Sequence, residues 1–459
     1  MGKLWKKLRK KIGGKSENYV ISDIVDIGGD ESHRFHLRFL KDGRGLLNID
    51  AKHIIYLNST AREYVDLMIK GHSDDDITNF FLKRYNGVNI DDIRSDLTVI
   101  KKKLFMLLSE EGHCPIHDIG LRPMARNEDL GFPLRVDLAV TYNCNNRCEH
   151  CYVPANILNN FPVELNTEGI KKIMDKLWDI GVPHIALTGG EASLRLDILE
   201  LIEYGQYKGF VMGIITNGRM FSNKKFVEEA VHRGLDYAQI TIESHIPEIH
   251  DAMQCVDGAW QETTAAIKNF VESGIFTLTN TTISKANVQD IEKTVEFLKE
   301  LGLEAFAMNG LIYSGKGVEL QRNSDVFLQE SELEPLLDGI YSKADELGLR
   351  FIWYTPTQYC VFNPMEMGLG AKRCSAASAS MGIQPNGDVI PCQSYFEPVG
   401  NILDDDWDEI WNSKLFKKIR GHQLIEKKCQ KCEMLDLCGG GCPLYISEKR
   451  HNIGHVVPL

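Results

Sequence analysis

The sequence predicts an α/β protein in which a partial (β/α)6 barrel is flanked by an N-terminal winged-helix-like α+β domain and a C-terminal cysteine-rich domain. Three observations predict this class. Six apolar runs alternate with amphipathic helical patterns between Pro133 and about Tyr313, a short strand-then-helix pattern precedes them, and six of the twelve cysteines lie between Cys374 and Cys442. Repeated strand–helix units indicate a parallel sheet, whose active site is expected at the carboxyl ends of its strands.

Five segments are expected along the chain. They are a basic tail (1–17), a small domain (18–110), a linker (111–132), the partial barrel (133–325), and a bridging helix with the cysteine-rich domain (326–459). The barrel strands are expected at 134–141, 184–188, 210–216, 236–243, 275–282 and 304–308. A helix over 168–180 is expected after the first strand, because apolar residues recur there at helical spacing and Gly181 follows.

Bulk composition is that of a globular protein, with 43% hydrophobic and 25% charged residues. There is neither an apolar run of about 18 residues nor a signal-peptide core, so we place the chain in the cytoplasm. Cytosolic thiols stay reduced, and twelve cysteines therefore indicate metal ligation rather than disulfides.

Charge argues against nucleic acid as a partner. The formal net charge is −12, and the helical part of the small domain is close to neutral. The first fifteen residues are different, with seven basic residues and no acidic one. Residues 1–12 could touch an anionic membrane surface, and a solvated tail is the alternative.

The stretch NCNNRCEHCY begins where the first barrel strand ends and holds Cys144, Cys148 and Cys151. Three thiolates leave one position of an iron–sulfur cube or a zinc site open for a substrate or cofactor. The alternative is a structural zinc site completed by His150 or by a distant cysteine. Polar residues also end the next strands, where Gly189, Gly190 and Glu191 follow the second and Glu243 and Ser244 the fourth.

The cysteine spacing CxxxCxxC followed by GGE at 189–191 resembles the radical SAM superfamily. The resemblance implies that Cys144, Cys148 and Cys151 hold a [4Fe–4S] cluster whose fourth iron binds S-adenosylmethionine (SAM). It also implies that Gly189, Gly190 and Glu191 contact the methionyl ammonium group of SAM, and that Glu243 and Ser244 contact the ribose.

Two residues depart from this family pattern. His150 stands before the third cysteine, where relatives usually have an aromatic or apolar residue, and it adds a titratable group. Gln254 stands where relatives often have arginine, so no contact by that arginine is carried over.

The C-terminal cysteines are spaced CX12GX4C and then CX2CX5CX3C, which resembles the SPASM extension with its auxiliary [4Fe–4S] clusters. The resemblance implies that Cys374, Cys392 and Cys442 serve a first cluster and that Cys429, Cys432 and Cys438 serve a second. A zinc ribbon is the alternative for the last four cysteines.

The usual last cysteine of the SPASM pattern is absent, so a second auxiliary cluster needs another ligand. Asp436, His451 and His455 are candidates, or the position is open or that cluster is lost. Cys360 is a candidate fourth ligand of the first cluster, and an ordinary buried thiol is the alternative.

The run beginning at Tyr56, with its NxxA and DLxxxG-type pattern, resembles the PqqD-like family of peptide chaperones, also called the RiPP recognition element. The resemblance implies that an exposed strand edge captures the leader of a precursor peptide by β-augmentation. The expected function is therefore radical SAM modification of a ribosomally made peptide, by crosslinking or epimerisation, with an electron donor such as flavodoxin or ferredoxin. Cys255 is a hypothetical hydrogen donor.

Two other functions remain open. One is radical chemistry on a porphyrin, a quinone-type precursor or a protein side chain, and the other is a zinc- or cluster-bearing binding module without catalysis.

Overall fold

The structure is a computed structural model of the 459-residue chain, and it describes residues 19–22, 33–108, 131–155, 157, 163–321, 328 and 330–452. The expected basic tail, most of the expected linker and His455 lie outside these residues. The chain divides into two compact units, one of residues 1–130 with 204–211 and one of residues 131–203 with 212–459. None of the described helices is long and apolar enough to cross a membrane.

The N-terminal unit consists of an antiparallel sheet followed by three helices. The sheet has four strands in the order β1-β2-β3-β4. The strands are β1 (Tyr19–Ser22), β2 (Phe35–Phe39), β3 (Gly45–Ile49) and β4 (His53–Leu57), and the helices are α2 (Ser59–Ile69), α3 (Asp74–Arg84) and α4 (Ile90–Leu108). The apolar residues of the helical pattern, among them Tyr64, Val65 and Phe81, form one core with the sheet.

Capping side chains explain where the first two of these helices begin. Asn58 accepts a hydrogen bond from the backbone N–H of Ala61, and Ser73 forms a reciprocal capping box with Asp76. The aspartates that open α3 also face the positive end of the helix dipole.

The second unit is built on a ten-stranded sheet with the order β11-β10-β9-β8-β7-β6-β5-β12-β13-β14. Its strands are β5 (Arg135–Thr141), β6 (His184–Gly189), β7 (Val211–Thr216), β8 (Tyr237–Thr241), β9 (Phe276–Ile283), β10 (Ala305–Gly310), β11 (Arg350–Trp353), β12 (Ser380–Ile383), β13 (Asp388–Ile390) and β14 (Gly400–Asn401). All six predicted barrel strands are present. Two further strands extend the parallel part, β11 beside β10 and β12 beside β5.

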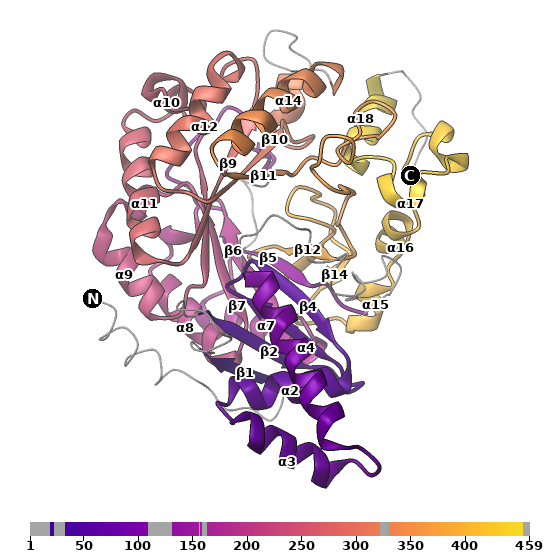
Figure 1. Ribbon diagram of the computed structural model, residues 1–459. Helices are drawn as coiled ribbons and strands as arrows, with labels where there is room; N and C mark the ends of the chain where they lie inside the picture. Colours follow the sequence, from indigo (N-terminus) through magenta and orange to yellow (C-terminus); the bar gives the residue numbers. More distant parts are fainter. Residues whose placement is uncertain are drawn as a thin grey trace. The chain divides into compact units, whose positions relative to one another are not determined.

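The helices between the barrel strands include α9, α11, α10 and α12, which lie along the outer side of the curved sheet in Figure 1. The helices and 3₁₀ turns of this part are α7 (Thr167–Ile180), η1 (Ala192–Leu194), α8 (Ile198–Lys208), η2 (Arg219–Ser222), α9 (Lys224–His232), α10 (Pro247–Gln254), α11 (Ala259–Ser273), η3 (Val288–Asp290), α12 (Ile291–Glu300), α13 (Lys316–Gln321) and α14 (Glu330–Glu346). The predicted helix at 168–180 is confirmed as α7.

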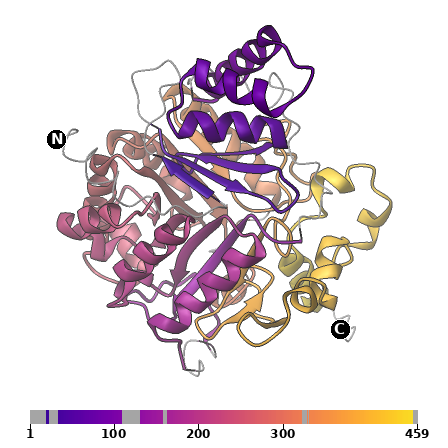
Figure 2. The same cartoon turned by 90° about the horizontal axis from the view of Figure 1, so that it is seen from below.

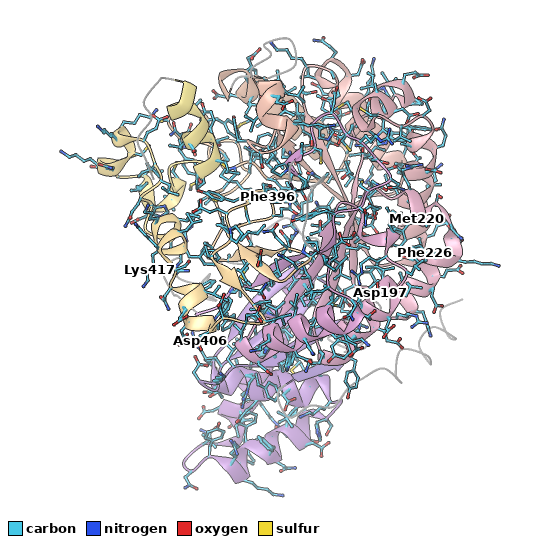
Figure 3. All side chains as sticks on the ribbon, turned by 180° about the vertical axis from the view of Figure 1, so that it is seen from behind. Asp197, Met220, Phe226, Phe396, Asp406 and Lys417 are labelled. Atoms are coloured by element: carbon cyan, nitrogen blue, oxygen red, sulfur yellow. The ribbon has the colours of Figure 1, made fainter. Side chains whose placement is uncertain are left out.

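The cysteine-rich region continues the barrel sheet through β12 and then folds into short elements. These are α15 (Trp407–Trp411), α16 (Lys414–Arg420), η4 (Lys427–Lys431), α17 (Leu435–Cys438) and α18 (Pro443–Asn452). Figure 2 shows them on one side of the strands β12–β14. Phe396, labelled in Figure 3, packs against Tyr142 with 6.2 Å between ring centroids, so this region shares a small apolar cluster with the barrel.

Candidate active site

Cys144, Cys148 and Cys151 lie in the loop that follows β5, at the expected end of the sheet. Burial raises the pKa of the Cys148 thiol well above its ordinary value, and the charges of Cys151 and Cys144 raise it further. The three thiols are thus close enough to influence one another's ionisation. Thiolates are the form of cysteine that binds metal. The positive charge of iron would stabilise these buried thiolates, which burial otherwise disfavours.

No group of three His, Cys, Asp or Glu side chains within the described ranges is arranged to hold a single metal ion. An iron–sulfur cube is wider than one ion, so its cysteine ligands stand further apart.

Neighbouring strand ends hold this cysteine loop in place. The backbone N–H groups of Arg147 and Glu149 donate to carbonyl oxygens of Gln254 (3.2 Å) and Met253 (3.1 Å), at the end of α10. The Arg219 guanidinium, just after β7, donates to the Asn145 carbonyl oxygen at 2.7 Å. The loop is therefore fixed by residues that follow two other barrel strands.

Lys316, after β10, adds a third attachment. Its backbone N–H donates to the Cys151 carbonyl oxygen at 2.9 Å, and its Nζ donates to the carbonyl oxygens of Arg147 and Cys148, both at 3.3 Å. Lys316 and Arg219 were not singled out from the sequence, although both lie just after a barrel strand in the glycine-containing runs YSGKG and TNGR.

The glycines at 189 and 190 are required by close backbone contact. A Cβ atom at Gly189 would lie 1.9 Å from the Thr141 carbonyl oxygen, and one at Gly190 would lie 2.5 Å from the Asn143 carbonyl oxygen. The end of β6 therefore lies directly against the start of the cysteine loop. The expected contact of these glycines with SAM stays a prediction.

Glu191 is buried and its carboxylate is occupied by groups of this protein. It accepts hydrogen bonds from the backbone N–H of Ser193 (3.1 Å), the Thr216 hydroxyl (2.7 Å) and the backbone N–H of Asn217 (2.7 Å). Burial raises its pKa, while these hydrogen bonds act in the opposite direction. In this arrangement Glu191 ties the end of β6 to the end of β7.

The two residues that depart from the family pattern contact the same carboxylate. Glu243 Oε1 lies 3.0 Å from His150 Nε2 and accepts a hydrogen bond from Gln254 Nε2 at 3.1 Å, and Oε2 accepts from the Thr282 N–H at 2.8 Å. The side-chain oxygen of Gln254, Oε1, in turn accepts from the Cys148 thiol at 2.9 Å. A hydrogen-bonded chain thus links His150, Glu243 and Gln254 to a cysteine of the loop.

Glu243 and Ser244 are almost fully buried, at 0% and 1% exposure. The Ser244 hydroxyl accepts from the Ile246 N–H at 3.0 Å. Their expected contact with a ribose stays a prediction.

His150 Nδ1 is buried without a hydrogen-bond partner in this structure. An orphaned polar atom in the loop that carries the three cysteines fits a site completed by a polar cofactor.

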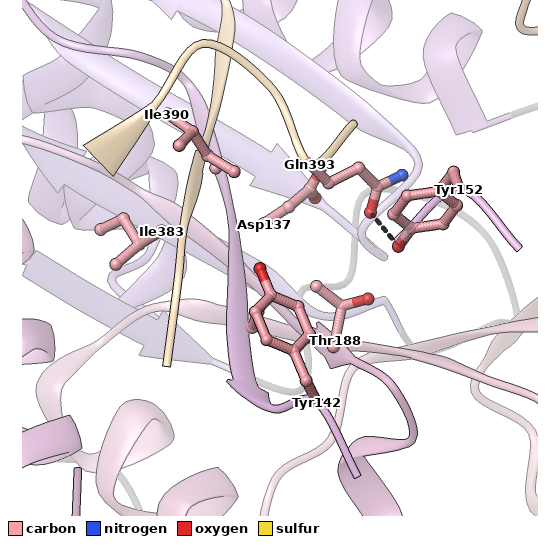
Figure 4. A pocket seen from close by; sticks show the side chains of 10 residues that line it. Asp137, Tyr142, Tyr152, Thr188, Ile383, Ile390 and Gln393 are labelled. Atoms are coloured by element: carbon pink, nitrogen blue, oxygen red, sulfur yellow. Dashed lines mark hydrogen bonds between the residues drawn. The ribbon is translucent and has the colours of Figure 1, made fainter. Parts of the chain in front are cut away.

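A small pocket lies between the barrel and the cysteine-rich region (Figure 4). It is lined by residues of β5, β6 and β12, with Tyr142 and Tyr152 from the cysteine loop and Gln393 beside Cys392. The Tyr152 hydroxyl donates to Gln393 Oε1 at 3.4 Å, the bond drawn in Figure 4. Burial raises the pKa of Tyr152, and the nearby Cys151 raises it further, so this phenol stays protonated.

The assignment of the C-terminal cysteines to two sets stays a prediction. Burial raises the pKa of Cys374, and the nearby Cys442 and Cys392 raise it further. Between Cys438 and Cys442 the chain runs through Gly439, Gly440 and Gly441 with φ values of 71°, 78° and 89°. Glycine adopts this left-handed conformation readily, so the chain can turn sharply between these two cysteines.

Cys360 is close enough to Cys429 for its charge to raise the pKa of that thiol, and the N–H of its neighbour Tyr359 donates to Cys438 Sγ at 3.3 Å. Its role as a ligand of the first cluster stays a prediction. The side chain of His451 lies outside the described residues.

Cys255 is exposed at the carboxyl end of α10, and its thiol donates to the Ala252 carbonyl oxygen of the same turn at 3.4 Å. Its role as a hydrogen donor stays a prediction. Its backbone has φ 53° and ψ 40°, a left-handed conformation that is costly for residues other than glycine.

We expect Cys255→Gly to raise the free energy of unfolding by about 0.5–1 kcal/mol, because glycine adopts this conformation without strain. Chemical denaturation of the cluster-free protein would measure the change. Cys255→Ala removes the thiol but keeps the strain, so it serves as the matched control. Equal stability of the two variants would contradict the expectation.

Comparisons with known proteins agree with this geometry. Residues 138–298 match the radical SAM superfamily, and residues 374–433 match SPASM, an iron–sulfur cluster-binding domain. The chain is therefore a radical SAM enzyme. It uses a [4Fe–4S] cluster and S-adenosyl-L-methionine, and its SPASM domain binds auxiliary iron–sulfur clusters.

Its relatives act on different substrates. The AdoMet-dependent heme synthase of Methanosarcina barkeri is 28% identical over 329 residues, 67% of this chain and 90% of that protein. The antilisterial bacteriocin subtilosin biosynthesis protein AlbA of Bacillus subtilis is 25% identical over 323 residues, 68% of each chain. The crystal structure of Streptococcus suis SuiB bound to precursor peptide SuiA shares the fold, with a TM-score of 0.62, 18% identity and coverage of 92% of this chain and 96% of that one.

Proposed function

We propose that this radical SAM enzyme modifies a ribosomally made peptide whose leader binds to the N-terminal domain. The observation that carries the proposal is the extent of the likeness to SuiB, which was solved with a precursor peptide. That likeness covers 92% of this chain, whereas residues 1–130 make up more than a quarter of it. It must therefore take in part of the N-terminal unit.

In this proposal Cys144, Cys148 and Cys151 hold the SAM-binding cluster. When bound and reduced, the cluster supplies the electron that cleaves SAM to methionine and a 5′-deoxyadenosyl radical. The protein's own part is to hold the loop rigid through Arg219, Lys316 and the end of α10. Gly189 and Gly190 let the end of β6 lie against the cysteine loop, where they would contact the methionyl group of SAM, while Glu191 ties the ends of β6 and β7 together.

The auxiliary sets would accept an electron or bind a substrate thiolate during crosslinking or epimerisation of the peptide. Cys374, Cys392 and Cys442 form the first set, and Cys429, Cys432 and Cys438 form the second. A protein electron donor such as flavodoxin or ferredoxin would reduce the SAM-binding cluster.

The leader would add to the sheet of the N-terminal domain at β4, one end of the strand order. Ile54 on this strand is 42% exposed although it is a large apolar residue. We expect Ile54→Lys to weaken binding of the precursor peptide by about tenfold, as loss of one apolar anchor costs about 1–2 kcal/mol.

Fluorescence anisotropy with a labelled peptide would measure this binding. Met365→Lys is the matched control, because Met365 has a similar exposure of 44% and lies in the other unit. Equal losses in both variants would argue against leader binding at β4.

A test of the substrate class uses the reconstituted enzyme with dithionite and SAM. We expect a mass change in a short peptide encoded beside the gene, and no change when its leader is removed. The second candidate substrate is an iron porphyrin, which the heme synthase relatives favour. Turnover of the porphyrin without change in any peptide would overturn the peptide proposal.

A further inference from the structure

We propose that Cys360 is the fourth ligand of the second auxiliary cluster, together with Cys429, Cys432 and Cys438. This inference rests on the proposed assignment of the second cysteine set to an iron–sulfur cluster. In the SPASM pattern a cysteine beyond Cys442 takes this position, and residues 443–459 contain none.

The segment that precedes Cys360 packs directly on two thiols of the second set. The Tyr359 N–H donates to Cys438 Sγ at 3.3 Å, and Gln358 Nε2 lies 3.9 Å from Cys429 Sγ. The Cys438 thiol also contacts the Thr357 carbonyl oxygen at 3.7 Å. Three consecutive residues thus surround these sulfurs, and Cys360 is the next residue along the chain.

With Cys360 included, the second set has four cysteines, Cys360, Cys429, Cys432 and Cys438. A fourth thiolate beside three others is the donor set that a [4Fe–4S] cluster takes.

A buried amide faces the second set. Gln358 is 1% exposed. Its Nε2 faces the Cys429 sulfur and the Gly440 carbonyl oxygen at 3.4 Å. An amide N–H directed at cysteine sulfur is the kind of contact that tunes cluster potential.

The other candidates for this position fit less well. Asp436 offers a carboxylate, and Fe–S clusters are held by thiolates in preference to harder oxygen ligands. With Cys360 in the second set, the first set keeps Cys374, Cys392 and Cys442, which leaves one iron position for a ligand from outside the motif.

Alkylation of the native protein tests the assignment without measuring catalysis. Cys360 and Cys255 are both exposed in the cluster-free structure. The cluster-free and the fully reconstituted protein would be treated anaerobically with iodoacetamide, and modification at each cysteine would be followed by mass spectrometry. We expect reconstitution to slow alkylation of Cys360 by about tenfold or more, because a metal-bound thiolate is not free to react, and to leave Cys255 unchanged.

Two double variants then identify the cluster that protects Cys360. Cys429→Ala/Cys432→Ala should abolish the protection, whereas Cys374→Ala/Cys392→Ala should leave it intact. The reverse pattern would assign Cys360 to the first cluster and overturn the inference. Rapid alkylation of Cys360 in the reconstituted wild-type protein would overturn it as well, and needs no variant to fold. Formation of 5′-deoxyadenosine from SAM by the same sample tests the proposed enzyme function independently of the Cys360 assignment.

Discussion

Cys148→Ala should reduce formation of 5′-deoxyadenosine from SAM to the background of a protein-free reaction. Loss of one thiolate leaves two ligands for a cube that needs three from the protein, and it also removes the sulfur that Gln254 contacts at 2.9 Å. Chromatography of the products after dithionite reduction would measure the effect.

The matched control is Cys255→Ala, since Cys255 is a cysteine outside the three sets and its hypothetical role lies after SAM cleavage. Wild-type cleavage by Cys148→Ala would show that this loop does not hold the catalytic cluster.

Replacement of Glu243 should have the largest effect on stability. The carboxylate is fully buried and bonded to His150, Gln254 and the Thr282 N–H, so its removal leaves three buried polar groups without their acceptor. We expect Glu243→Leu to lower the free energy of unfolding of the cluster-free protein by about 3–5 kcal/mol. Glu243→Gln keeps an acceptor and should cost less. Urea denaturation at constant pH would measure both, and equal losses would contradict this explanation.

The contact of His150 with Glu243 predicts that the free energy of unfolding depends on pH. Burial lowers the pKa of His150, but attraction to Glu243 outweighs burial and the net shift is upward. A histidine whose pKa is higher in the folded state contributes stability that is complete below its unfolded value of about 6.5 and is lost as pH rises through the folded value. The free energy of unfolding should therefore fall above pH 6.5, and His150→Phe should flatten that decline.

Sequence patterns located the barrel because its strands and helices follow local periodicity. The expected strand at 134–141 is β5 at Arg135–Thr141, and the expected helix at 168–180 is α7 at Thr167–Ile180. In contrast, β12 is a four-residue strand containing serine and glycine, and only its pairing with β5 makes it part of the sheet. Local propensity gives no signal for such a strand.

The residues of the candidate site were also predictable from the sequence only where their pattern is local. Spacing identified Cys144, Cys148 and Cys151, because their ligand geometry depends on a short loop. The contacts of Glu243 with His150 and Gln254 join residues far apart in the sequence, so only the folded chain reveals them. Cys360 is a similar case: it lies 14 positions before Cys374 in the sequence, but in the folded chain its charge acts on Cys429.

The pairing of β12 with β5 also bears on how the protein withstands loss of iron. β5 carries the cysteine loop, and Val136 and Leu138 within it are fully buried. If the SPASM region unfolded after losing its clusters, β12 would no longer pair with β5. β5 would then be an edge strand with unpaired backbone N–H and C=O groups. Long apolar edges recruit strands from other molecules. The auxiliary clusters would thus protect the catalytic domain from aggregation, whatever part they take in the chemistry.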